Sequence, residues 1–134
     1  MYSKQVAEHI ANPRNVGELV NPTGAGDVTN EVCMDRIRLT IRVEAGRLVE
    51  AKMKASGCGP TIAAASVLTE LITGRKLDEL ASLGRQQIIA ALGHLPATKK
   101  HSAALAVEAL HAAIKDSQQT NRSLECGDLS PLSS

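Results

Sequence analysis

A change in the spacing of apolar residues near position 57 constrains the fold of this chain more than any other sequence feature. Between residues 36 and 55, apolar and polar side chains alternate, with a turn at residues 44–47. Alternation puts successive side chains on opposite faces of a strand, so this segment predicts an antiparallel hairpin. After Gly57-Cys58-Gly59-Pro60, apolar positions recur every three or four residues, as in a helix. Strands followed by helices predict an α+β architecture.

The remaining elements follow from the same patterns. Ahead of the hairpin, residues 3–11 predict a short helix, and residues 15–30 an irregular or weakly extended segment. After the hairpin we expect a loop at residues 95–98 and helices over 60–73, 77–83, 85–92 and 103–117. The expected inward positions of the hairpin are Ile37, Leu39, Ile41 and Val43 on one strand and Val49, Ala51, Met53 and Ala55 on the other.

The overall composition favours one domain without a strongly charged surface. A chain of 134 residues fits one domain, and its 15 basic residues nearly cancel its 14 acidic ones. The only aromatic residue is Tyr2 and there is no basic stripe, so nucleic-acid binding is not expected. From Ser117 the chain turns polar. We therefore expect a domain over residues 1–116 and a disordered tail over residues 117–134.

Cellular location is predicted from features that the sequence lacks. Its apolar runs are too short to cross a bilayer, and its first residues lack the pattern of a secretory signal. We therefore expect no membrane association and a cytoplasmic protein with reduced thiols. The odd number of cysteines, three, also argues against a disulfide framework.

Three short segments carry residues that can bind a metal ion. They are Cys33-Met34-Asp35, Gly57-Cys58-Gly59 and Lys99-Lys100-His101-Ser102. Cys58 precedes a predicted helix whose free backbone N–H groups stabilise an anion. It is therefore placed to be a thiolate, either a metal ligand or a sulfur acceptor. The structural alternative is a small apolar residue buried at a tight turn.

The neighbouring residues give weaker signals. Cys33 and Asp35 lie two residues apart, so in an extended chain their side chains point to the same side and could share a cation. His101 alone is more often a surface residue than a ligand, and Ser102 is expected to be the N-cap of the last helix. The other histidines have no partner in the sequence and are interpreted as structural or surface residues: His9, His94 and His111.

Together, these segments resemble the U-type iron–sulfur cluster assembly scaffold family, meaning IscU and the N-terminal domain of NifU. Cys33-Met34-Asp35 corresponds to the family's Cys-Gly-Asp, Gly57-Cys58-Gly59 to its Gly-Cys-Gly, and Lys99–Ser102 to its Lys-x-His-Cys. The resemblance covers about residues 2–116. Further matches are Asn12-Pro13-Arg14-Asn15-Val16-Gly17, Gly24-Ala25-Gly26 and Gly74-Arg75-Lys76-Leu77-Asp78-Glu79.

The resemblance implies both a fold and a role. The fold is a three-stranded antiparallel sheet packed by helices, with the first strand at about residues 24–30 and three loops meeting at one end. In the role, a cysteine desulfurase supplies sulfur, iron joins it, and a transient [2Fe–2S] cluster forms for transfer to client iron–sulfur proteins. The protein would be a scaffold and carrier, not an enzyme, acting as a monomer or homo-oligomer. By position, Cys33, Asp35, Cys58 and His101 would be metal ligands, Cys58 or Cys33 the sulfur acceptor, and Lys99 a nearby cation.

The chain departs from the family pattern at three places. Ser102 replaces the third cysteine, and a serine hydroxyl is a poorer ligand for iron–sulfide and cannot carry a persulfide. Ser102 is therefore at most a weak, substituted ligand. Met34 replaces a glycine, which stiffens the first loop. Residues 95–99 only partly match the segment read by the family's dedicated chaperone, which argues against that interaction.

Three interpretations follow. The chain is a working scaffold variant, since histidine replaces cysteine in some [2Fe–2S] centres. Alternatively, the same four ligands hold one Zn²⁺ or Fe²⁺ in a paralogue that acts as an adaptor or regulatory partner. In the third, only the fold persists, as an interaction module. Cys126 could fold back to supply a third thiol, because nine residues after Ser117 reach about 30 Å. A free thiol in the tail is the simpler interpretation.

Overall fold

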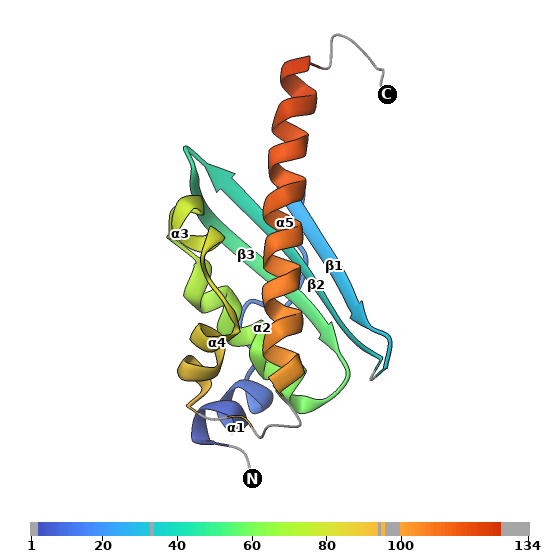
Figure 1. Cartoon of the computed structure of the whole chain (residues 1–134), viewed down its shortest axis with the longest axis vertical. Helices are drawn as coiled ribbons and strands as arrows, with labels where there is room; N and C mark the ends of the chain where they lie inside the picture. The colour runs from blue at the N-terminus through green and yellow to red at the C-terminus, as the bar shows by residue number, and fades with distance from the viewer. Residues whose placement is uncertain (1–2, 33, 94, 96–99, 127–134) are drawn as a thin grey trace.

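The protein is built from a three-stranded antiparallel sheet with helices packed on it (Figure 1). The computed structural model describes residues 3–32, 34–93, 95 and 100–126, the segment 119–126 by its backbone alone. In chain order the elements are α1 (Lys4–Ala11), β1 (Gly24–Asn30), β2 (Asp35–Glu44), β3 (Arg47–Ser56), α2 (Gly59–Ile72), α3 (Leu77–Ala81), α4 (Arg85–Leu92) and α5 (Lys100–Cys126). The strands lie in the order β1-β2-β3. The predicted α+β class and sheet are confirmed.

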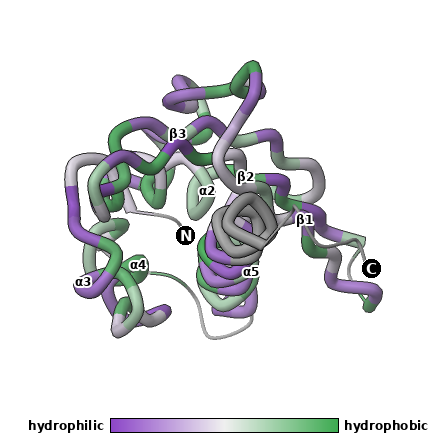
Figure 2. The backbone as a smooth tube through the Cα atoms, turned by 90° about the horizontal axis from the view of Figure 1, so that it is seen from above, coloured by the Kyte–Doolittle hydropathy of each residue, from purple (hydrophilic) through white to green (hydrophobic). Residues whose placement is uncertain are grey.

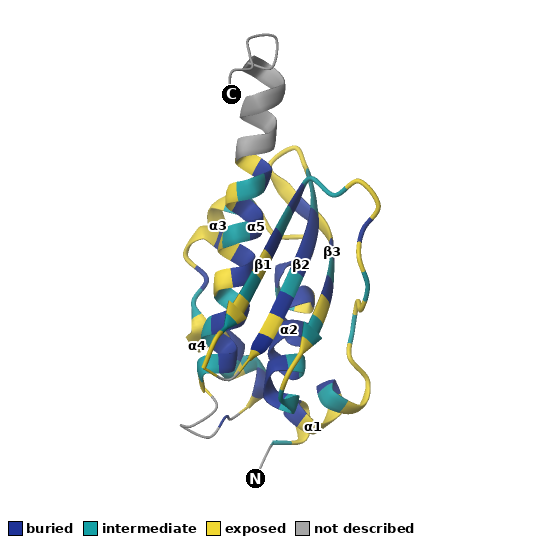
Figure 3. Cartoon of the chain, turned by 90° about the vertical axis from the view of Figure 1, so that its right-hand side faces the viewer, coloured by how far each residue is buried: buried dark blue, intermediate teal, exposed yellow. Residues whose placement is uncertain are grey.

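The helices form a second layer behind the sheet. Figure 2 looks along α5 and shows the strands on one side and α2, α4 and α5 on the other. Within this arrangement α5 packs mainly on β1 and β2, and α2 on β3. Figure 3, coloured by burial, shows the sheet in front of the helices and buried residues along its strands. No helix in the described part of the chain is long and apolar enough to cross a membrane.

The first hairpin strand was predicted correctly, but the second contains an irregularity that the alternation did not show. Ile37, Leu39 and Ile41 of β2 are fully buried. On β3, Val49 was expected to face inward, yet it is exposed and Leu48 is buried instead. The pairing explains this correction, because Arg42 pairs with Glu50 and Val43 with Leu48, which leaves Val49 as the extra residue of a β-bulge.

Helix α5 is longer than its apolar pattern indicated. It begins at Lys100 and continues to Cys126, whereas the sequence predicted a helix over residues 103–117. The tail's first residues are therefore helical in backbone, and residues 127–134 lie outside the described part. The division of the chain at residues 116 and 117 stays a prediction. So does the loop at residues 95–98, of which only Leu95 is described.

Two glycines of β1 let α5 approach the sheet closely. A Cβ atom on Gly26 would lie 2.3 Å from the carbonyl oxygen of Ala109, and one on Gly24 would lie 2.3 Å from that of Ala113. Between them, the backbone N–H of Ala25 donates a hydrogen bond to Asp116 Oδ2 at 2.9 Å. The Gly-x-Gly pattern therefore has a packing cause, since any side chain at these positions would push α5 away from β1.

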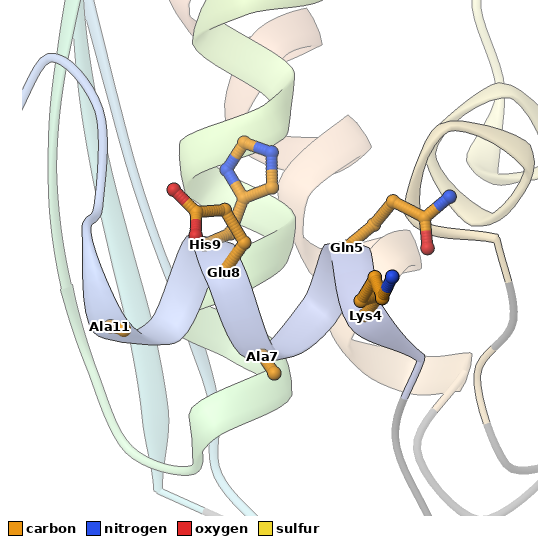
Figure 4. Close-up of a pocket in the computed structure, with 6 residues that line it drawn as sticks. All are labelled: Lys4, Gln5, Ala7, Glu8, His9 and Ala11. Carbon is orange, nitrogen blue, oxygen red and sulfur yellow. The ribbon is translucent and has the colours of Figure 1, made fainter.

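Helix α1 is attached to α2 through His9. Figure 4 shows this side chain pointing from α1 toward α2. His9 is buried, and its Nδ1 lies 2.6 Å from Ser66 Oγ, while Nε2 lies 3.6 Å from Glu70 Oε1. Arg14 Nη1 also approaches His9 Nδ1, at 3.5 Å. Because a guanidinium only donates, this contact favours the tautomer with the proton on Nε2.

Candidate metal centre

Asp35, Cys58 and His101 meet at the end of the sheet where β2 begins and β3 ends. One ligand atom from each residue lies within 4.8 Å of the other two. Asp35 is the first residue of β2, Cys58 is the N-cap of α2, and His101 lies in the first turn of α5. The pairing of Arg36 with Ser56 places the start of β2 beside the loop that leads to Cys58. Residues distant in the sequence are thus joined by strand pairing and by the packing of α5.

Asp35 is the buried centre of this group. Its Oδ2 accepts hydrogen bonds from Thr61 Oγ1 at 2.7 Å and from the Cys58 thiol at 3.4 Å, and lies 3.2 Å from His101 Nε2. Its Oδ1 accepts the backbone N–H of Cys58 at 3.1 Å. Burial acts to raise the pKa of Asp35, but the hydrogen bonds from Thr61, Cys58 and His101 outweigh it and lower the pKa. The carboxylate is therefore held in its charged form.

Cys58 stands at the N-terminus of α2 with its thiol directed at the other polar groups. Its carbonyl oxygen accepts the first bonds of the helix, from the N–H groups of Thr61 at 3.1 Å and Ile62 at 3.3 Å. Its Sγ lies 3.3 Å from Thr61 Oγ1 and 3.8 Å from Ser102 Oγ. The prediction that Cys58 precedes a helix is confirmed.

Ser102 is not the helix N-cap that the sequence predicted. Helix α5 begins at Lys100, so Ser102 lies inside its first turn. There it is fully buried, and its hydroxyl lies 3.0 Å from Thr61 Oγ1. The basic pair Lys99-Lys100 gave no capping signal that would have marked the earlier start.

The structure brings together three of the four predicted ligands. Asp35, Cys58 and His101 are adjacent, whereas Cys33 and the predicted nearby cation Lys99 lie outside the described residues. Cys126 cannot fold back to this site within its own chain, because α5 is continuous and carries it about 36 Å from Ser102.

Sequence reasoning missed Thr61. It is fully buried and contacts Asp35, Cys58 and Ser102. Its place three residues after Cys58 puts both on the same side of α2, which is the signal that could have indicated it.

The other histidines lie outside this group. His9 is structural and His111 is exposed on α5, as the sequence indicated, while His94 lies outside the described residues. A groove along α1 is separate as well, since none of its lining residues belongs to the centre: Lys4, Gln5, Ala7, Glu8, His9 and Ala11 (Figure 4).

Comparisons with known proteins agree with this geometry. The family model described as the NifU-like N terminal domain matches residues 1–128. The iron–sulfur cluster assembly scaffold protein IscU 1 of Archaeoglobus fulgidus is 38% identical over 125 residues, covering 93% of this chain and 82% of its own length. The bifunctional protein NifU/MnmA of Rubrobacter xylanophilus is 45% identical over 117 residues, or 86% of this chain, which spans only 24% of that relative.

A solved structure shows the same fold. It is a NifU-like N-terminal protein from Brucella abortus, with a TM-score of 0.74 at 18% identity, covering 87% of this chain and 94% of that one. The family model matches nearly the whole chain, and the identity extends over most of the length of the IscU scaffold protein from Archaeoglobus fulgidus. The chain belongs to the family of NifU-like N-terminal domains.

Proposed function

We propose that this protein is an iron–sulfur cluster assembly scaffold that binds iron and a transient [2Fe–2S] cluster through Cys33, Asp35, Cys58 and His101. The observation that carries the proposal is the convergence of a carboxylate, a thiol and an imidazole whose ligand atoms lie within 4.8 Å of one another. Relatives that the chain covers over most of their length are named as iron–sulfur cluster assembly scaffolds, which supports the same role.

The three described donors suit a cluster that is built and then released. Thiolates such as Cys58 bind iron and sulfide strongly, and histidine replaces cysteine in some [2Fe–2S] centres. Asp35 offers a harder oxygen ligand that iron–sulfide binds less tightly, so it favours release of the cargo. The cluster is the protein's cargo, and the protein is a carrier and not a catalyst. Its partners are a cysteine desulfurase and the client proteins that receive the cluster.

Cys58 is the described residue best placed to accept sulfur. The residue is only partly buried, and it stands at the N-terminus of α2 beside the other ligands. The thiolate attacks the outer sulfur of a persulfide on the desulfurase, and a Cys58 persulfide forms as the desulfurase's cysteine leaves as a thiolate. Cys33 is the second candidate acceptor. A cytoplasmic location and a monomeric or homo-oligomeric state stay predictions.

A mononuclear metal site is the second candidate function. It is favoured by Ser102, whose buried hydroxyl stands 3.8 Å from Cys58 Sγ where the family has a thiol. Cysteine, histidine and carboxylate donors fit a four-coordinate zinc ion, and Cys58, His101 and Asp35 supply one donor of each kind. In this case the protein holds Zn²⁺ or Fe²⁺ and acts as an adaptor or regulatory partner.

Anaerobic reconstitution with iron and sulfide tests the proposal. A scaffold develops the visible charge-transfer absorption of an iron–sulfur cluster, whereas a zinc protein stays colourless and gives one equivalent of metal by elemental analysis. We expect Cys58→Ala and His101→Ala to lose the absorption, and His111→Ala, an exposed histidine of the same helix, to keep it. A Cys58→Ala protein with unchanged absorption would contradict the ligand assignment.

A further inference from the structure

Two buried hydroxyl groups and the Asp35 carboxylate form a continuous chain of hydrogen bonds inside the centre. Ser102 Oγ lies 3.0 Å from Thr61 Oγ1, and Thr61 Oγ1 lies 2.7 Å from Asp35 Oδ2. Thr61 and Ser102 are fully buried and Asp35 is 1% exposed. These three side chains come from α2, α5 and β2, so the chain of bonds links the three elements that build the site.

The chemistry of the carboxylate fixes the direction of these bonds. An ionised carboxylate only accepts, so the single proton of the Thr61 hydroxyl is donated to Asp35. The contact between Thr61 and Ser102 is then a hydrogen bond only if Ser102 donates its own proton to Thr61. The reverse order would remove the charge-assisted bond to Asp35, which is the stronger of the two.

Once its proton is committed to Thr61, Ser102 offers only lone pairs to its surroundings. Its Oγ also lies 3.8 Å from Cys58 Sγ, a ligand of the proposed centre. A hydroxyl oxygen with its proton turned away is a neutral acceptor, and it can also bind a cation. Without Thr61, the same hydroxyl would be free to rotate and donate its proton to Cys58 Sγ.

We propose that Thr61 is a positioning residue that turns Ser102 into a neutral oxygen donor toward a metal bound by Asp35, Cys58 and His101. This inference rests on the proposed function, because it requires a metal at those three residues. The centre then carries oxygen from Asp35 and Ser102 beside the sulfur of Cys58. Such a donor set binds divalent iron, cobalt or zinc without needing the third thiolate that the chain lacks.

Binding of Co²⁺ tests the proposal, because its visible absorption reports the number and kind of its ligands. Thr61→Val removes the hydroxyl with little change of volume. We expect it to weaken Co²⁺ binding by about tenfold, as loss of a residue that orients a ligand does, and to shift the visible bands. Ser102→Ala removes the oxygen donor itself and should shift the same bands. Because both changes remove that donor, adding Ser102→Ala to Thr61→Val should lower the affinity by much less than Ser102→Ala does alone. Thr61→Ser restores the hydroxyl and should restore affinity and spectrum.

The matched control is Thr69→Val. Thr69 is also a fully buried threonine of α2, but its hydroxyl bonds to Asn15 and to the carbonyl oxygen of Ser66, away from the centre. It should leave the Co²⁺ spectrum unchanged even if it lowers stability. If Thr61→Val does not fold, Thr61→Ala removes the same hydroxyl and takes its place in the series.

The result that overturns this inference is a Thr61→Val or Ser102→Ala protein with the wild-type Co²⁺ affinity and spectrum. If Cys58→Ala abolishes binding in the same series, the ligand assignment stands and only the role of Thr61 fails. If Cys58→Ala binds Co²⁺ as the wild type does, the ligand assignment fails, and the positioning role fails with it.

Discussion

The backbone of Gly57 lies against the carboxylate of Asp35. A Cβ atom at position 57 would stand 2.0 Å from Asp35 Oδ1, and Gly57 has a φ of 123°. Glycine is therefore required at this position for two reasons. Its backbone has a positive φ, and the carboxylate fills the space that a side chain would need. This contact places Asp35 next to Cys58.

We expect Gly57→Ala to lower the free energy of unfolding by about 2 kcal/mol or more, because backbone strain and steric overlap add. It should also weaken metal binding, since relief of the overlap requires Asp35 to move. Gly46→Ala is the control, because Gly46 also has a positive φ, 75°, but no atom within 4 Å of the added Cβ. Urea unfolding and metal titration measure both effects. Equal losses in the two variants would show that the contact with Asp35 has no energetic importance.

Gly26→Ala should separate α5 from β1. The added methyl group would stand 2.3 Å from the carbonyl oxygen of Ala109, and we expect a loss of about 1–3 kcal/mol from this overpacking. Gly84→Ala is the comparison, since its Cβ would meet only Gln87 Oε1 at 3.6 Å. Its cost should be that of replacing the glycine N-cap of α4 by alanine, about 0.5–1 kcal/mol, with no steric overlap added. Denaturation midpoints check the difference. A Gly26→Ala protein as stable as the wild type would mean that α5 adjusts without cost.

Met34→Gly should stabilise the protein. Met34 has a φ of 61°, a left-handed conformation that costs about 1 kcal/mol for a residue with a side chain. Its side chain is 70% exposed, so little packing is lost when it is removed. Met34→Ala keeps the Cβ atom and should give no such gain. Thermal unfolding of the two variants separates them, and a less stable glycine variant would argue against strain at this loop.

The stability of the fold should fall in weak acid because of His9. Burial, and next the positive charge of Arg14, lower its pKa below the ordinary 6.5, against the opposing effects of Glu70 and Glu8. The unfolded chain therefore binds the proton more readily. The contribution of His9 is complete above pH 6.5 and is lost as the pH falls from there through the lower pKa of the folded state.

Urea unfolding of wild type, His9→Asn and His111→Asn at several pH values between 7.5 and 5 isolates this contribution. We expect the slope of stability against pH to be shallower in His9→Asn and unchanged in His111→Asn, whose side chain is exposed. Parallel curves for wild type and His9→Asn would exclude His9 as the origin.

Ser102→Cys should strengthen the cluster-binding site. It adds a thiol beside Thr61 and close to Cys58, and thiolates are better ligands for iron and sulfide than hydroxyls. After anaerobic reconstitution we expect more iron and sulfide per protein and stronger visible absorption than in the wild type. Ser102→Ala is the control and should show no gain. A colourless Ser102→Cys protein that still binds one metal ion would favour the mononuclear function.

The sequence predicts elements well where apolar periodicity is strong. The alternation of Ile37, Leu39 and Ile41 and the helical spacing after Cys58 identified β2 and α2. Strand β1 has no such pattern, since Gly24 and Gly26 occupy its inward face, and only the resemblance to a family placed it correctly.

Features that depend on contacts between distant segments could not be predicted from the sequence. Val49 became exposed because of a bulge that depends on pairing with β2, and the start of α5 at Lys100 carried no capping signal. For the candidate site, residue types and motifs pointed to Asp35, Cys58 and His101, which the fold brings together. The role of Thr61 depends on Asp35 and Ser102 lying on either side of it, which only the folded chain reveals.

The seating of α5 on the glycines of β1 has a mechanical consequence. His101 and Ser102 lie in the first turn of α5, a helix of 27 residues. Further along its length, α5 packs closely against Gly24 and Gly26 of β1. The His101 imidazole and the Ser102 hydroxyl therefore move together with α5. Any tilt of α5 about its contacts with Gly24 and Gly26 would move both groups away from the Asp35 carboxylate and the Cys58 thiol in a single movement.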